Sequence, residues 1–167
     1  MVGPWHTPAS RDALAPEMDS LVPGDSDTTP RTGLISILLV EDSPTDAELT
    51  REVLREAKVR STLHVVRDGE AGLAFLRGAR RPDLVLLDLN LPGKDGREVL
   101  AEIKSDARLR HIPVVILSAS PADEDVAAAY ANQANAYIRK PADLDEFVEC
   151  VRILEAFWLS VVRLPPR

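Results

Sequence analysis

Short, mostly apolar runs alternate with longer amphipathic segments from residue 34 onward. Runs that are apolar on successive residues are typical of parallel strands buried on both faces. The predicted strands are residues 34–40, 62–66, 84–87, 114–117 and 136–138. Segments with apolar residues at helical spacing follow these runs, and an alternation of strand and helix predicts a parallel sheet covered by helices.

Capping residues mark where the helices are expected to begin. Ser and Asp accept hydrogen bonds from the free N–H groups of the first helical turn, and proline is favoured at the first helical position. The predicted caps are Ser43 before Pro44, Asp68, Ser120 before Pro121, and Asp143 at the start of a long last helix.

Polar residues follow four of the five runs at the point where each run ends. Glu41 and Asp42 follow the first run, Asp88 the third, Ser118 the fourth and Lys140 the fifth. The carboxyl ends of parallel strands meet at one edge of a sheet, where ligands bind in open α/β folds, so we expect one pocket. An aspartate nucleophile beside a lysine and a hydroxyl suits phosphoryl transfer, which needs charge neutralised on the phosphoryl oxygens. Three acids in one place also require a cation, and Mg²⁺ suits carboxylate oxygens.

These residues resemble the receiver domain of two-component response regulators over about residues 34–160. The resemblance is carried by Glu41-Asp42, Asp88 within Leu87-Asp88-Leu89-Asn90-Leu91-Pro92-Gly93, Ser118-Ala119, Tyr137 and Lys140-Pro141. It implies a doubly wound (βα)5 flavodoxin-like parallel sheet in the strand order 2-1-3-4-5, with the site at the switch between strands 1 and 3.

The resemblance also implies a role for each site residue. Asp88 is the phosphoacceptor for a sensor histidine kinase, and the chain assists its own phosphorylation and dephosphorylation without being an enzyme for a separate substrate. The implied Mg²⁺ ligands are Asp42, Asp88 and the Asn90 backbone carbonyl, with Glu41 acting through water. Ser118 and Lys140 bind phosphoryl oxygens, Tyr137 changes rotamer, and the bond before Pro141 is cis.

Residues 88–100 and 143–159 are similar to stand-alone receivers that are paired with bacterial phytochrome histidine kinases. This narrower resemblance implies a phosphohistidine on a phytochrome as the phosphoryl donor. Because the chain stops soon after the last predicted helix, we expect no output domain.

The last predicted helix carries more apolar residues than one sheet face should cover. A core stripe comprises Leu144, Phe147, Val148, Val151, Leu154 and Trp158, and a neighbouring stripe comprises Cys150, Ile153, Phe157, Val161 and Leu164. An exposed apolar stripe implies a partner, and a symmetric homodimer is the simplest one. The predicted interface is Cys150, Ile153, Phe157, Trp158, Leu159 and Val161. The alternative is that the C-terminal tail folds back on its own domain.

Composition narrows the remaining possibilities. The net charge of −7 and the absence of a basic stripe argue against nucleic-acid binding. The apolar runs are too short to span a membrane, and Cys150 is the only cysteine, so we expect a cytoplasmic protein. Residues 1–33, rich in proline and small polar residues, are predicted to form a disordered extension. Residues 161–167 are expected to form a tail that continues from the last helix.

Two other classes of function were weighed against a phosphorylation switch. Haloacid-dehalogenase-like hydrolases carry a second aspartate two residues after the nucleophile, where this chain has Asn90, and little chain remains for a substrate cap. An interaction module with a decayed site would be expected to lack Asp88 or Lys140, and both are present. Taken singly, each site residue could be a cap, a turn residue or a surface charge.

Overall fold

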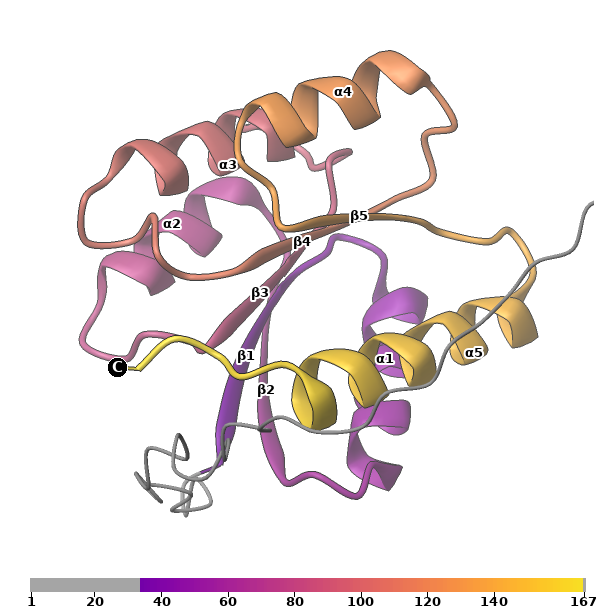
Figure 1. Cartoon of the computed structure of the whole chain (residues 1–167). Helices are drawn as coiled ribbons and strands as arrows, with labels where there is room; N and C mark the ends of the chain where they lie inside the picture. Colours follow the sequence, from indigo (N-terminus) through magenta and orange to yellow (C-terminus); the bar gives the residue numbers. More distant parts are fainter. Residues whose placement is uncertain (1–33, 167) are drawn as a thin grey trace, which may run out of the picture. The chain divides into compact units, whose positions relative to one another are not determined.

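Five parallel strands form one sheet in the computed structural model, which describes residues 34–166 (Figure 1). The strands are β1 (Ile35–Val40), β2 (Ser61–Val66), β3 (Leu84–Leu87), β4 (Val114–Ser118) and β5 (Ala136–Arg139). Their order is β2-β1-β3-β4-β5, and every neighbouring pair is parallel. The predicted fold class and strand order are therefore confirmed. The predicted disordered extension, residues 1–33, lies outside the described residues.

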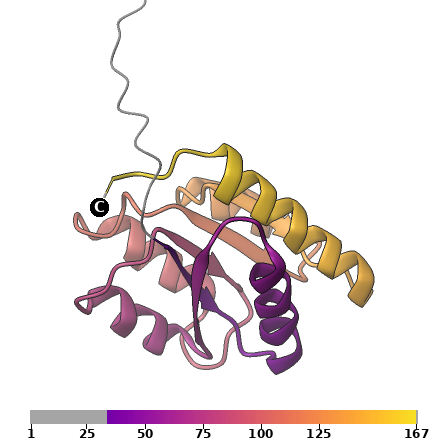
Figure 2. The same ribbon diagram turned by 90° about the horizontal axis from the view of Figure 1, so that it is seen from below.

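Helices cover both faces of the sheet. They are α1 (Pro44–Glu56), α2 (Gly69–Arg77), α3 (Gly96–Ser105), α4 (Asp123–Ala131) and α5 (Leu144–Glu155), which continues into a π-helical segment, η1 (Ala156–Val161). The helices α1 and α5 lie on one face, and α2, α3 and α4 lie on the other (Figures 1 and 2).

Successive residues of the central strands point to opposite faces and are buried on both. Leu38 of β1 packs in the core beneath α2, α3 and α4, whereas Ile37 and Leu39 pack in the core beneath α1 and α5. All three are at most 1% exposed. This two-sided burial explains why the strands read as continuous apolar runs instead of alternating ones.

The predicted caps hold for three helices and fail for one. The side chains of Ser43, Asp68 and Asp143 accept hydrogen bonds from the first turns of α1, α2 and α5. Ser120, in contrast, caps no helix, because α4 begins at Asp123 after Ala122. The Ser120 hydroxyl instead donates to Asp125 Oδ2 at 2.5 Å and accepts the Ala122 N–H at 3.3 Å, just before the helix begins.

The structure corrects the prediction for the last helix at three residues. Leu144, expected in the core, is 56% exposed at the start of α5. Trp158, assigned both to the core stripe and to the interface, is 9% exposed and packs in the core. Leu159, expected in the interface, is 7% exposed and also packs in the core; it lies in η1, whose wider turn, closed by the Val162 N–H donating to Phe157 O at 2.9 Å, departs from helical spacing.

After η1 the tail leaves the helix and packs against the domain. Leu164 is 6% exposed and lies in the same apolar cluster as Ile35 and Leu84. In both views the tail runs back toward the amino edge of the sheet (Figures 1 and 2). The folding back that was weighed as an alternative therefore occurs for Leu164, while other apolar residues of α5 and η1 stay exposed.

The start of α3 approaches the loop after β3 so closely that it requires glycine. A Cβ atom added to Gly96 would lie 2.1 Å from Asp88 O and 2.6 Å from Leu89 Cα. The Gly96 N–H also donates to Leu89 O at 2.9 Å. The position of the Asp88 backbone thus depends on the absence of a side chain at Gly96.

We expect Gly96→Ala to lower the free energy of unfolding by about 2–3 kcal/mol, because the clash is with backbone atoms that cannot rotate away. Urea denaturation measures the change. Gly93→Ala is the control: Gly93 has φ +72° and open space around it, so alanine there meets only backbone strain of about 1 kcal/mol. Equal losses in the two variants would contradict the steric account.

Candidate functional site

Asp88 lies directly after β3, at the carboxyl edge of the sheet, and its carboxylate is held on both oxygens. Its backbone N–H donates to Val40 O at 3.0 Å, which continues the pairing of β3 with β1. The side chain is 8% exposed. Oδ1 accepts the Asn90 N–H at 3.0 Å, and Oδ2 accepts from Lys140 Nζ at 2.9 Å. The carboxylate is therefore oriented, and a small part of it remains accessible.

Two further acids follow β1 at the same edge. The Glu41 N–H donates to Val66 O at 2.9 Å, and its buried side chain accepts the Ser43 N–H at 3.0 Å. Asp42 is exposed. Carboxylate oxygens of Glu41, Asp42 and Asp88 lie within 4.8 Å of one another. The structure thus brings together the three acids that the sequence predicted to share one pocket.

Lys140 is the cation of this cluster and contacts three carboxylates. Its ammonium is hydrogen-bonded to Glu41 Oε2, to Asp88 Oδ2 at 2.9 Å and to Asp46 Oδ2 at 3.1 Å. Asp46 was missed as a site residue, since the sequence indicated only that it lies in the first turn of α1. Its place four residues after Asp42, on the first turn of a helix that starts at the site, was the available signal.

Burial and the ion pair have opposite effects on the pKa values of Glu41 and Lys140. Burial raises the pKa of Glu41 above its ordinary value, although the hydrogen bond from Lys140 opposes this. Burial also acts against the Lys140 ammonium, but its hydrogen bonds to Glu41 and Asp88 outweigh burial and raise the pKa of Lys140. Lys140 is therefore charged at neutral pH.

The peptide bond between Lys140 and Pro141 is trans, because residues 34–166 contain no cis peptide bond. The prediction of a cis bond at Pro141 is therefore wrong. Trans is the more stable form of an X-Pro bond when nothing in the fold selects against it. The Lys140 N–H donates to Ser118 O at 2.8 Å, so the pairing of β5 with β4 already brings Lys140 to the site.

Ser118 and Tyr137, the two predicted switch residues, both contact Ser120. Ser118 ends β4, is fully buried, and accepts the Ser120 N–H on its hydroxyl oxygen at 3.2 Å. The Tyr137 hydroxyl donates to Ser120 O at 3.2 Å, and its partly buried ring packs against the core beneath α2, α3 and α4. The rotamer change of Tyr137 stays a prediction.

Ser120 also begins a charged network that sequence reasoning missed. Its hydroxyl donates to Asp125, whose other oxygen accepts from Arg97 Nη2 at 2.6 Å, and Arg97 in turn pairs with Asp95 at 3.0 Å. The hydrogen bonds from Ser120 and Arg97 hold the pKa of Asp125 below its ordinary value. The network joins the loop after β4 to the first turns of α3 and α4. The contact that joins its two halves, between Arg97 and Asp125, spans 28 residues and has no local sequence signal.

The acidic set fits a hard divalent cation. Ligands on opposite sides of an octahedral Mg²⁺ ion are about 4.2 Å apart, and oxygens of Glu41, Asp42 and Asp88 that all lie within 4.8 Å of one another are near enough to surround one ion, directly or through water. Asp42 is exposed, so water can complete the coordination. Asn90 is exposed and its N–H donates to Asp88 Oδ1, so its backbone lies beside the cluster.

Among the described residues, no helix is both long and apolar enough to cross a membrane.

Comparison with known proteins identifies one family. A sequence model of the response regulator receiver domain matches residues 37–152. The response regulator Rcp1 of Synechocystis sp. is 47% identical over 135 residues, which span 77% of this chain and 92% of Rcp1. The probable methanogenesis regulatory protein FilR2 of Methanothrix harundinacea is 40% identical over 134 residues, or 77% of this chain and 86% of FilR2.

Solved structures that align with this chain are also response regulators. The phosphorylated cyanobacterial phytochrome response regulator RcpA aligns with a TM-score of 0.78 and 47% identity, covering 80% of this chain and 100% of RcpA. The Mn²⁺-bound form of Rcp1 aligns with a TM-score of 0.77 and 47% identity, covering 78% of this chain and 99% of Rcp1.

The ion pairs of Lys140 predict a stability change that depends on metal. Lys140→Met removes the charge and leaves Glu41 and Asp88 buried without a partner, so we expect the free energy of unfolding in EDTA to fall by about 3–5 kcal/mol. Added Mg²⁺ should restore part of the loss by neutralising the same carboxylates. Urea denaturation with EDTA and with Mg²⁺ measures both effects.

Lys94→Met serves as the control, because Lys94 pairs with Glu70 and Glu102 away from the acidic cluster. It should lose much less stability and gain no additional response to Mg²⁺. If Lys140→Met is as stable as the parent chain in EDTA, the ammonium does not hold these carboxylates in the way described.

Proposed function

The chain belongs to the response regulator receiver domain family, and from this premise we propose that it is a phosphorylation switch whose acceptor is Asp88. The observation that carries the proposal is the buried Asp88 carboxylate, hydrogen-bonded to Lys140 and beside Glu41 and Asp42. A receiver needs a nucleophile, a cation for the phosphoryl oxygens and an acidic metal site, and these residues supply all three.

The donor in this proposal is a phosphohistidine. A carboxylate oxygen of Asp88 attacks the phosphorus, the P–N bond breaks, and the donor imidazole leaves with the electron pair of that bond. Lys140 and the Ser118 hydroxyl then bind phosphoryl oxygens, where they stabilise the charge that develops during transfer. Lys140 must exchange a carboxylate contact for a phosphoryl contact during this step.

The proposed cofactor is Mg²⁺. Asp42, Asp88 and the Asn90 carbonyl would hold it directly, and Glu41 would hold it through water. When bound, the ion would neutralise negative charge on the phosphoryl oxygens. The Mn²⁺-bound form of Rcp1, a relative at 47% identity, supports a divalent ion as the cofactor of this chain.

The proposed partner is a histidine kinase of the bacterial phytochrome class, in the cytoplasm. Support comes from RcpA, which is described as a cyanobacterial phytochrome response regulator and shares 47% identity with this chain. A bacteriophytochrome response regulator, RtBRR, also aligns at 39% identity with a TM-score of 0.61.

We propose further that the chain itself assists hydrolysis of its own phosphoryl group. In this proposal it is not an enzyme for a separate substrate.

Ser118 and Tyr137 would carry the structural change from the phosphorylated site to the surface. Both contact Ser120, whose hydroxyl is bound to Asp125 at the start of α4. Movement of Ser118 toward a phosphoryl group would change its hydrogen bond with Ser120 and leave Tyr137 free to change rotamer. Phosphorylation would thus alter the surface formed by α4 and β5.

A homodimer through the last helix is the proposed assembly. Ile153, Phe157 and Val161 are 62%, 52% and 73% exposed. Ile153 and Phe157 line an apolar hollow of about 480 Å³ beside β5, together with Ile138 and Cys150. Trp158 also lines the hollow, but it and Leu159 are only 9% and 7% exposed, so the proposed contact rests on Ile153, Phe157 and Val161. Isologous contact between two copies of this surface would cover it.

Phosphorylation is tested by intact mass after incubation with acetyl phosphate and Mg²⁺. We expect one phosphoryl adduct on the native chain and none on Asp88→Asn or in EDTA, because the nucleophile and the cation are both required. Asp46→Asn is the matched control, since Asp46 contacts Lys140 but is not the nucleophile, and it should retain the adduct. An adduct of equal yield on Asp88→Asn would refute the assignment.

Partner choice is tested by phosphotransfer from radiolabelled kinases. A phytochrome histidine kinase should lose its label to this chain faster than an unrelated histidine kinase does, with no transfer to Asp88→Asn. Faster transfer from the unrelated kinase would exclude phytochrome as the preferred donor and would leave the assignment of Asp88 intact.

The dimer is tested by replacing exposed apolar residues. Ile153→Ser with Val161→Ser should shift the mass measured by light scattering from dimer to monomer, because the exposed apolar contact is lost. Leu144→Ser is the control, since Leu144 is comparably exposed, at 56%, but lies at the other end of α5. A native chain that is monomeric at all concentrations would disprove the dimer.

A further inference from the structure

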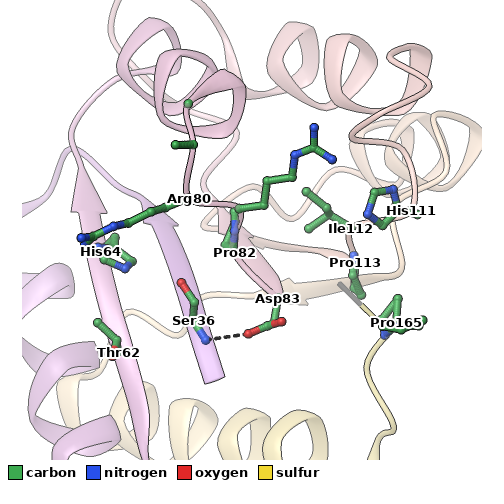
Figure 3. A pocket seen from close by; sticks show the side chains of 14 residues that line it. Ser36, Thr62, His64, Arg80, Pro82, Asp83, His111, Ile112, Pro113 and Pro165 are labelled. Carbon is green, nitrogen blue, oxygen red and sulfur yellow. Dashed lines mark hydrogen bonds between the residues drawn. The ribbon is translucent and has the colours of Figure 1, made fainter. Parts of the chain in front are cut away.

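A second hollow lies at the amino edge of the sheet, the edge opposite Asp88. Its volume is about 720 Å³, within the range of about 300–1,000 Å³ that is usual for small-molecule sites. Figure 3 shows that Ser36 and Asp83 lie between two walls. Thr62 and His64 of β2, with Arg80, form one wall, and His111, Ile112, Pro113 and Pro165 form the other.

The polar groups between the walls are fixed by hydrogen bonds. The Ser36 N–H donates to Asp83 Oδ2 at 2.8 Å, and the Asp83 N–H donates to Ser36 O at 2.7 Å. This reciprocal pair ties the start of β1 to the residue before β3. The carboxylate is 6% exposed and engaged, so the basic side chains of the walls determine which ligands the hollow attracts.

Two arginines of the lining, Arg80 and Arg81, have no acidic partner within residues 34–166. Arg80 is exposed and makes no hydrogen bond or ion pair with any other residue in the described range 34–166. Figure 3 shows its side chain extending toward His64. Arg81 donates only to Arg108 O, at 3.4 Å. On a chain with a net charge of −7, this local excess of basic groups favours an anion.

The apolar part of the lining is formed by three prolines and Ile112. Pro82, Pro113 and Pro165 have no backbone N–H to donate, and Ile112 is buried. An apolar surface of this kind suits a ring rather than a second charged group. The hollow therefore combines basic side chains with an apolar surface.

We propose that this hollow binds a small organic phosphate that carries a ring, of the mononucleotide class. The guanidinium of Arg80, with His64 beside it, would take the phosphate, since a guanidinium matches the geometry of phosphate oxygens. The ring would lie against the wall of Pro113 and Pro165. The site is separate from the phosphoacceptor, and its ligand is not a phosphoryl donor.

Calorimetric titration of the full chain with AMP and with GMP, in EDTA so that the acidic site stays inactive, tests the proposal. We expect saturable binding of at least one mononucleotide, and weaker binding of inorganic phosphate and of the matching nucleoside. Arg80→Ala should weaken nucleotide binding about tenfold or more through loss of a charge-assisted contact.

Arg51→Ala is the charge-matched control, because Arg51 lies on α1, pairs with Glu48 and does not line the hollow. It should bind as the parent chain does. Absence of saturable binding by both nucleotides at millimolar concentration overturns the proposal. So does equal affinity in the parent chain and Arg80→Ala, or inorganic phosphate that binds as tightly as the nucleotide.

Discussion

The buried contact between Lys140 and its carboxylates is the interaction on which the rest of the site depends. Glu41 and Asp88 are taken out of water side by side, and without a cation they would repel each other strongly. The ammonium comes from beyond β5, whereas the acids come from β1 and β3, so only the completed sheet brings them together. Folding and site assembly are therefore the same event in this protein.

This arrangement also makes the site responsive to a new charge. Lys140 already satisfies several carboxylates, and a phosphoryl group on Asp88 would compete with them for the ammonium. The neighbouring Ser118 is held by Ser120, and Ser120 is held by Asp125, which Arg97 fixes to α3. A continuous set of hydrogen bonds thus connects Ser118, beside the phosphoacceptor, to the surface of α3 and α4.

The strands and the acidic cluster could be predicted because both follow from local rules. Continuous apolar runs indicate strands buried on two faces, and the carboxyl ends of parallel strands must meet. The failures have tertiary causes. Ser120 lies before the start of α4 and donates to Asp125 within it, Asp46 joins the site through Lys140, and Leu159 turns to the core within η1. The expected cis bond before Pro141 rested on the resemblance alone, and the bond is trans.

The reciprocal hydrogen bonds between Ser36 and Asp83 have a consequence for the opposite end of the same strands. Ser36 is the second residue of β1, which ends before Glu41, and Asp83 precedes β3, which ends before Asp88. The two ends are roughly 17 Å apart along buried, extended chain. Thermodynamic linkage is reciprocal, so binding at one end changes the equilibrium at the other end by the same free energy as the reverse. A ligand bound beside Ser36 and Asp83 that shifted the phosphorylation equilibrium of Asp88 would have its own affinity shifted by phosphorylation by the same factor.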